Sequence, residues 1–128
     1  MLFENQNVSQ REDGIFRRWF EDEFFELIVW YDKDKRQRIK GFQLCYDRFG
    51  DERALTWLRE TGFNHEKIDD TRGALSRPST PILVPDGIFQ SDVILKRFKE
   101  NSKEIDKKIA AFVKRKIKEY AGKLYDNL

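Results

Sequence analysis

The strongest strand pattern in this chain lies in residues 23–48, which read EFFELIVWYDKDKRQRIKGFQLCYDR. Its first half is aromatic and β-branched and lacks Gly and Pro, a composition typical of a pleated, partly buried strand. Successive side chains of a strand point to opposite faces. One face is therefore wholly apolar, with Phe25, Leu27, Val29 and Tyr31. The other face is mixed, with Phe24, Glu26, Ile28 and Trp30. We expect a core against the first face and a cover over much of the second.

A second strand is expected at residues 39–46, after a charged link at residues 32–38. The shortness of the link favours antiparallel pairing, because a parallel crossover needs a dozen or more residues. Gly41 inside the second pattern indicates a bulge or the close approach of another group.

Further strands are expected on both sides of this hairpin. Residues 14–20 and 54–59 have strand patterns, and residues 63–68 read as a short, weakly apolar edge strand. Residues 1–13 are polar and predict an arm, on which Leu2 and Phe3 could dock. Residues 69–80 have the composition of a long loop, the kind of segment that is often functional in a compact domain.

Two helices are expected at the end of the chain, after a short apolar run at residues 81–84 and a Pro-Asp-Gly turn. Ser91 resembles an N-cap for a short helix over residues 91–100. Asn101 and Glu104 resemble a capping box for a second helix. That helix, over residues 102–124, follows the 3.6-residue period closely and is amphipathic.

Strands first and helices last predict an α+β fold. At 128 residues the chain is long enough for one domain with one core. We expect an antiparallel meander of about four to five strands over residues 14–89, within a single domain of residues 14–128. The long C-terminal helix would pack on the sheet, after the short one.

The charge is unevenly distributed along the chain. Residues 1–95 hold 14 Lys and Arg against 18 Asp and Glu, whereas residues 96–128 hold 11 against 5. The basic helix could therefore bind nucleic acid or another anionic surface, through Lys107, Lys108, Lys114, Arg115 and Lys118. The solvated face of an ordinary amphipathic helix is the favoured explanation of this pattern, because aromatic residues are not interleaved with these lysines.

Cys45 is the only cysteine, so no intrachain disulfide can form. Together with a start that does not resemble a signal peptide, this predicts a cytoplasmic protein. No apolar run approaches the ~20 residues that span a bilayer, so we expect no membrane span.

Three groups of residues suggest chemistry without matching a defined site. A weak polar site is suggested by Cys45, His65, Asp69 and Asp70. Cys45 with His65 could form a thiolate nucleophile, and His65, Asp69 and Asp70, with Asp86, could ligate a metal ion. The spacing favours a buried cysteine and solvated turn carboxylates instead. The acidic cluster Glu21, Asp22, Glu23 and Glu26 lies near two tryptophans, in the general manner of carbohydrate-processing sites, although such clusters more often form solvated turns. We therefore expect no catalytic residue, cofactor or metal.

The aromatic residues remain, with eleven Phe, three Trp and four Tyr. Most belong to a core, but the excess predicts an interaction surface that includes Trp19, Phe24, Ile28, Trp30 and Trp57. The sequence therefore favours a non-catalytic module that binds another protein or its own copy as a homodimer, through an aromatic sheet face or the exposed edge of the hairpin. The alternative is a small-ligand-binding protein or enzyme with a site beside the 69–80 loop, where Gln43 and Arg18 could supply polar groups. Nucleic-acid binding is the third hypothesis.

Overall fold

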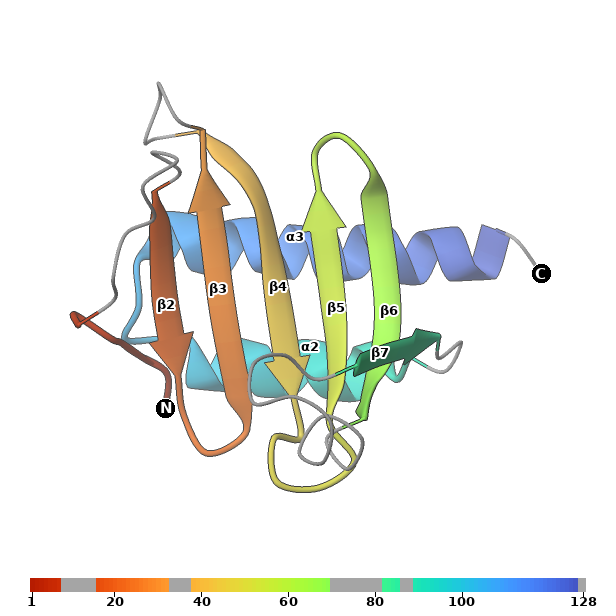
Figure 1. Cartoon of the computed structure of the whole chain (residues 1–128), viewed down its shortest axis with the longest axis horizontal. Coiled ribbons are helices and arrows are strands. Elements are labelled where there is room, and N and C mark those ends of the chain that lie inside the picture. The colour runs from red at the N-terminus through yellow and green to blue at the C-terminus, as the bar shows by residue number, and fades with distance from the viewer. Residues whose placement is uncertain (8–15, 33–37, 70–81, 86–88, 127–128) are drawn as a thin grey trace.

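The computed structural model describes residues 1–7, 16–32, 38–69, 82–85 and 89–126. In these residues the chain forms one antiparallel sheet and two helices (Figure 1). The strands follow one another across the sheet in chain order, from β1 at one edge to β7 at the other. Both helices come after the last strand. The α+β class and the order of a meander followed by helices are thus confirmed.

The centre of the sheet is the hairpin of β3 (Phe25–Tyr31) and β4 (Ile39–Tyr46). Burial alternates along β3, with every second residue buried, as the apolar face predicted. The two strands pair antiparallel. Their register shifts between Trp30 and Tyr31, opposite Gly41, so the irregularity expected at this glycine is present.

The sheet has more strands than the four to five expected. The other strands are β1 (Phe3–Glu4), β2 (Arg17–Glu21), β5 (Arg53–Leu58), β6 (Gly62–Asp69) and β7 (Ile82–Pro85). The expected N-terminal arm thus contains strand β1, which pairs with β2. Leu2 is fully buried beside it and donates its backbone N–H to the carbonyl of Asn101 at 2.8 Å.

Strand β6 is an internal strand, so the prediction of an edge strand at residues 63–68 was wrong. It pairs with β5 on one side and, along Glu66–Asp69, with β7 on the other. The sequence indicated an edge strand because β6 carries several polar residues, which are usual at the edge of a sheet.

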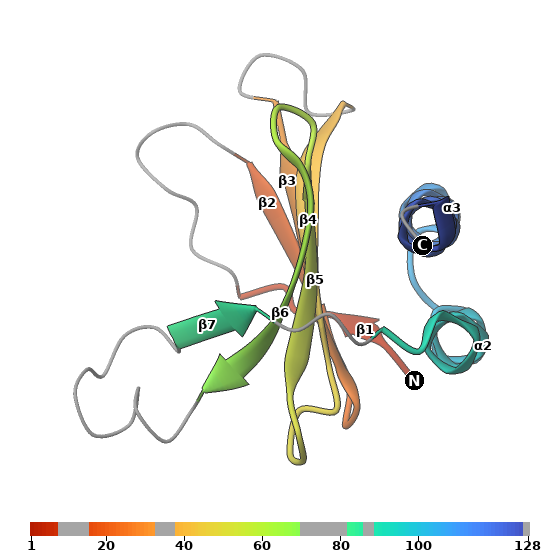
Figure 2. The same ribbon diagram turned by 90° about the vertical axis from the view of Figure 1, so that its right-hand side faces the viewer.

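The helices α2 (Ser91–Asn101) and α3 (Lys107–Asp126) lie on the same face of the sheet. Figure 2 shows both on one side of the strands, with α3 running across the sheet in Figure 1. The face that they cover is the apolar one, which carries Phe25, Leu27, Val29 and Tyr31. We call the opposite side of the sheet the outer face. Neither helix is long and apolar enough to cross a membrane, within the residues that the structure describes.

The first helix starts at residue 91 as expected, but the capping residues of both helices differ from the sequence-based expectation. Ser91 is the first helical residue of α2, and the N-cap is Gln90, which makes no side-chain capping hydrogen bond. The second helix starts at Lys107, five residues later than expected. Its cap is Asp106, whose Oδ1 accepts the backbone N–H of Lys108 at 2.9 Å. Asn101 belongs to α2 and makes no capping box for α3.

The core between the sheet and the helices contains several aromatic contacts. The rings of Phe25 and Phe98 meet edge to face with centroids 5.6 Å apart, and Phe112 makes the same kind of contact with Phe42 at 6.3 Å. Such pairs add to the free energy of area burial, which favours one packing arrangement of α2 and α3 on the sheet.

Gly41 lies too close to strand β5 to carry a larger side chain without a shift of its neighbours. A methyl group at this position would lie 2.5 Å from Cδ2 of Leu58 and 2.6 Å from the carbonyl oxygen of Trp57. The backbone oxygen cannot move freely within the sheet, so Gly41→Ala should lower the free energy of unfolding by about 1–3 kcal/mol in urea titrations.

The matched control is Gly122→Ala in α3, where nothing lies within 4 Å of the added methyl group. This change should leave the stability unchanged or raise it by about 0.5–1 kcal/mol, because alanine favours helix. Equal effects of the two substitutions would contradict the close approach at Gly41.

Candidate functional site

The outer face presents an apolar strip along β2 and β3. Trp19 pairs directly with Ile28, and Trp30 pairs with Arg17 two residues further along the strands. All three apolar side chains are partly exposed, whereas the alternate residues of β3 are buried. We call Trp19, Ile28 and Trp30 the apolar strip. It unites three of the five surface residues predicted from the sequence.

The strip has polar features of its own. Among the described residues, the indole N–H of Trp19 is buried and finds no hydrogen-bond partner. A buried donor without an acceptor costs free energy. The guanidinium of Arg17 lies 5.9 Å from the centroid of the same ring, a cation–π contact.

The other two predicted surface residues, Phe24 and Trp57, lie on the helix side. Phe24 precedes β3 and contacts Arg97 of α2, whose guanidinium lies 3.7 Å from its ring centroid. Trp57 packs against Phe112 with centroids 5.4 Å apart, and the ammonium of Lys116 lies 4.2 Å from its ring centroid. Trp57 belongs to the partly buried residues around the core, so only the apolar strip remains as a candidate surface.

A charged row borders the strip on the outer face. Glu21 of β2 pairs with Glu26 of β3, and Arg48 reaches both carboxylates, at 3.8 and 3.4 Å. Burial raises the pKa of Glu26 above its ordinary value; Arg48 partly opposes this shift and Glu21 adds to it. Two carboxylates therefore share one arginine, so this row carries a net negative charge.

The side chains in the middle of the outer face are polar or small. The side-chain amide of Gln43 donates to the hydroxyl of Thr56 at 3.1 Å. Cys45 is buried beside Ala54 and Ile68, the environment of a small hydrophobic residue.

The structure does not bring Cys45 and His65 together. Cys45 lies on the outer face, whereas His65 pairs with Leu55, whose side chain is in the core on the helix side. Asp69 is the last residue of β6, and Asp70 and Asp86 lie outside the described residues. Among the described residues, no group of three or more His, Cys, Asp and Glu side chains could hold a metal ion.

His65 is instead part of a buried aromatic cluster. Its Nε2 lies 2.6 Å from the hydroxyl of Tyr46, a hydrogen bond in which either group can donate. The rings of Phe89 and Tyr120 lie with their centroids 5.0 and 6.0 Å from the imidazole. His65 thus fixes Tyr46, which the sequence did not single out.

The basic helix α3 presents its cations to solvent. Lys107, Lys108, Arg115 and Lys118 are exposed and Lys114 is partly exposed. These residues lie on the opposite side of the molecule from the apolar strip.

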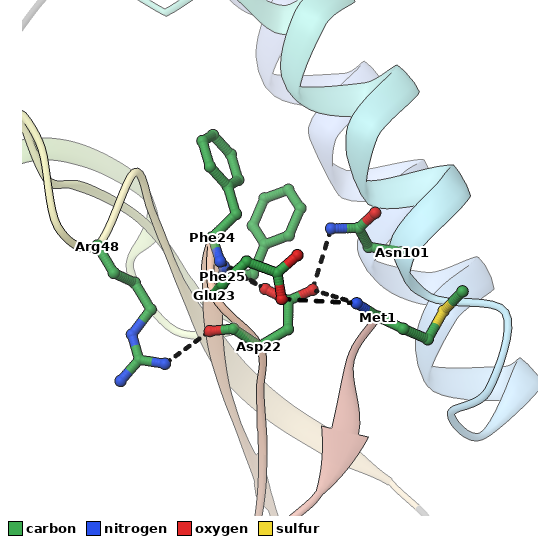
Figure 3. Close-up of polar contacts among 7 residues, drawn as sticks. All are labelled: Met1, Asp22, Glu23, Phe24, Phe25, Arg48 and Asn101. Carbon is green, nitrogen blue, oxygen red and sulfur yellow. Dashed lines mark hydrogen bonds and ion pairs between the residues drawn. The ribbon is translucent and has the colours of Figure 1, made fainter.

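The acidic cluster at residues 21–23 contains a structural carboxylate (Figure 3). Asp22 is buried, and its Oδ1 accepts the backbone N–H groups of Phe24 and Phe25 at 2.8 and 2.6 Å. Its Oδ2 accepts the side-chain amide of Asn101 at 3.0 Å and lies 3.4 Å from the amino group of Met1. This carboxylate therefore holds the β2–β3 turn against the end of α2, a role that the charge run did not reveal.

Asp22→Ala should lower the free energy of unfolding by about 2–4 kcal/mol in urea titrations, because two backbone N–H groups, the amide of Asn101 and the amino group of Met1 lose a buried, charged acceptor. Glu23→Ala, at the exposed neighbouring position, should change it by less than about 0.5 kcal/mol.

A swap of the two partners tests the geometry itself. Asn101→Asp alone sets two carboxylates against each other, whereas Asn101→Asp combined with Asp22→Asn restores a donor and an acceptor. The double variant should recover part of the stability that Asn101→Asp loses. If it is no more stable than Asn101→Asp, the contact between positions 22 and 101 does not account for the loss.

A second polar contact fixes the start of α3. Arg18 of β2 binds both carboxylate oxygens of Glu4, and its Nη1 donates to Oδ2 of Asp106 at 3.0 Å. The hydrogen bond from Arg18, followed by that from the backbone of Lys108, holds the pKa of Asp106 below its ordinary value. Three segments distant in sequence meet at this arginine.

The pKa of Asp106 predicts a dependence of stability on pH. A carboxyl whose pKa is lower in the folded than in the unfolded state stabilises the fold above about pH 4 and loses this effect as the pH falls through the folded-state pKa. Asp106→Asn keeps a capping side chain but removes the charge, at a cost of about 0.2–1 kcal/mol near neutral pH for a partly exposed pair. The difference from the unmodified protein should close below pH 4. A difference that stays constant down to pH 2.5 would contradict the assignment.

A hollow that the sequence did not predict lies at one end of the sheet. Its lining includes Asp47 and Arg53 at the ends of β4 and β5, with Gln90 and Val93 at the start of α2. It gathers residues from turns and helix ends, where no periodic pattern signals a site.

The chain has no match among known protein families, curated proteins or solved structures.

Proposed function

We propose that this protein is a non-catalytic module that associates with a second copy of itself through the apolar strip. The observation that carries the proposal is the placement of both helices on one face, while Trp19, Ile28 and Trp30 stay together and partly exposed on the other. Tryptophan is the residue type most enriched at the energetic centres of protein interfaces.

The charges around the strip support a symmetric partner. Arg17 stands at one end of β2 and Glu21 at the other, about 13 Å apart for four residues of extended chain. A two-fold axis in the interface, perpendicular to the strands and passing near Trp19, would place Arg17 of each copy opposite the glutamates of the other. A two-fold interface must be self-complementary, and this arrangement of an apolar centre between opposite charges meets that requirement.

With its single, buried cysteine the module suits a reducing compartment, and we place it in the cytoplasm.

Charge introduced into the strip should break the dimer. Trp30→Glu and, separately, Ile28→Lys should raise the dimer dissociation constant by at least about 30-fold in sedimentation equilibrium, the effect of losing an interface hot spot. Phe49→Glu is the matched control, since Phe49 is 84% exposed on the β4–β5 turn. It should leave the dissociation constant unchanged.

Circular dichroism separates loss of association from loss of folding, because a folded monomer keeps its thermal transition. A protein that stays monomeric at high concentration, or a dimer that both strip variants leave intact, would contradict the proposal.

A further inference from the structure

The hollow at the end of the sheet has the chemistry of a small-molecule site. Its volume is about 170 Å³, and it lies where the β2–β3 turn, the ends of β4 and β5 and the start of α2 meet. A cavity of about 150 Å³ in a protein core holds one benzene molecule. This hollow is therefore large enough for an apolar group of about four to six carbon atoms and too small for a drug-sized ligand.

The apolar wall comes from Phe24, Ile94 and Val93. Ile94 is 4% exposed, whereas Val93 is 56% exposed, so the hollow runs from the surface of the core to solvent. Val93 is one of the few large hydrophobic side chains that are exposed in the described residues. An apolar group seated against it would remove this surface from water.

The polar wall carries two opposite charges, Asp47 and Arg53, together with the amide of Gln90. Both charged groups are held by the β4–β5 turn. Asp47 has a positive φ of 57°, and its Oδ2 accepts the backbone N–H of Asp51 at 3.2 Å. Arg53 is oriented by Asp51, whose Oδ2 lies 3.0 Å from its Nη2. The turn thus presents a carboxylate and a guanidinium at fixed positions.

Tyr46 completes the lining, and its hydroxyl is committed to His65 in the buried aromatic cluster. The wall behind the ligand is consequently rigid. A preorganised site loses less conformational entropy on binding than a flexible one.

We propose that this hollow binds a free α-amino acid with an aliphatic side chain of leucine size. The ammonium group would meet Asp47, the carboxylate would meet Arg53, and the side chain would pack on Phe24, Val93 and Ile94. The lining holds one carboxylate and one guanidinium, the latter also paired with Asp51. This combination favours a zwitterion over an anion or a cation, because each charge of the ligand then gains an opposite partner. This site is distinct from the apolar strip and does not depend on the proposed dimer.

Isothermal titration calorimetry with the full chain tests the proposal through four ligands that share the isobutyl group of leucine. L-leucine should bind in a saturable manner. Isoamylamine, which lacks the carboxylate, and 4-methylpentanoate, which lacks the ammonium, should each bind at least about tenfold more weakly. N-acetyl-leucine amide, which carries neither charge, should not bind measurably.

Variants test which residue binds each charged group of the ligand. Arg53→Gln and Asp47→Asn should each weaken leucine binding at least about tenfold, whereas Arg53→Lys should keep part of it. Arg59→Gln is the matched control: this arginine follows β5 at its other end and pairs with Asp32. It should bind leucine like the unmodified chain. Absence of leucine binding, equal binding of the blocked amide, or equal loss in Arg59→Gln would overturn the proposal.

Discussion

The burial of one face of strand β3 is the constraint on which the rest of the structure depends. Phe25, Leu27 and Val29 are completely buried and Tyr31 nearly so. Each such side chain contributes about 1.5–3 kcal/mol when it is removed from water. A single sheet cannot cover its own face, so both helices pack there, and the polar contacts at Asp22 and Arg18 fix the helices against the strands.

This arrangement divides the molecule into a covered face and an outer face. Because both helices are used on the apolar side, the mixed face of β3 keeps Ile28 and Trp30 partly exposed. The same packing places the start of α2 at the ends of β4 and β5, where the hollow forms. The dimer surface and the ligand site proposed above therefore both follow from the packing of the two helices on one face of the sheet. They lie on different parts of the molecule.

The parts of the fold that the sequence predicted depend on local patterns. The alternation along β3, the irregularity at Gly41 and the helical period of α3 are each visible in a short window. The pairing of β1, the internal position of β6 and the start of α3 at Lys107 were missed, because each depends on a contact between distant segments. Arg18 and Asp106 are 88 residues apart in the chain, and no local signal links them. For the same reason Trp57 was grouped with the surface tryptophans, whereas Phe112 and Lys116 of α3 contact its ring.

The central claim is that the apolar strip forms the contact between two copies of the chain. Isotope-filtered NMR on a mixture of labelled and unlabelled protein measures this contact most directly, because it detects only protons on different molecules. The account predicts intermolecular nuclear Overhauser effects between the indole protons of Trp19 or Trp30 and the methyl groups of Ile28. Intermolecular effects that involve only residues of α2 and α3, or none at a concentration where the protein sediments as a dimer, would contradict it.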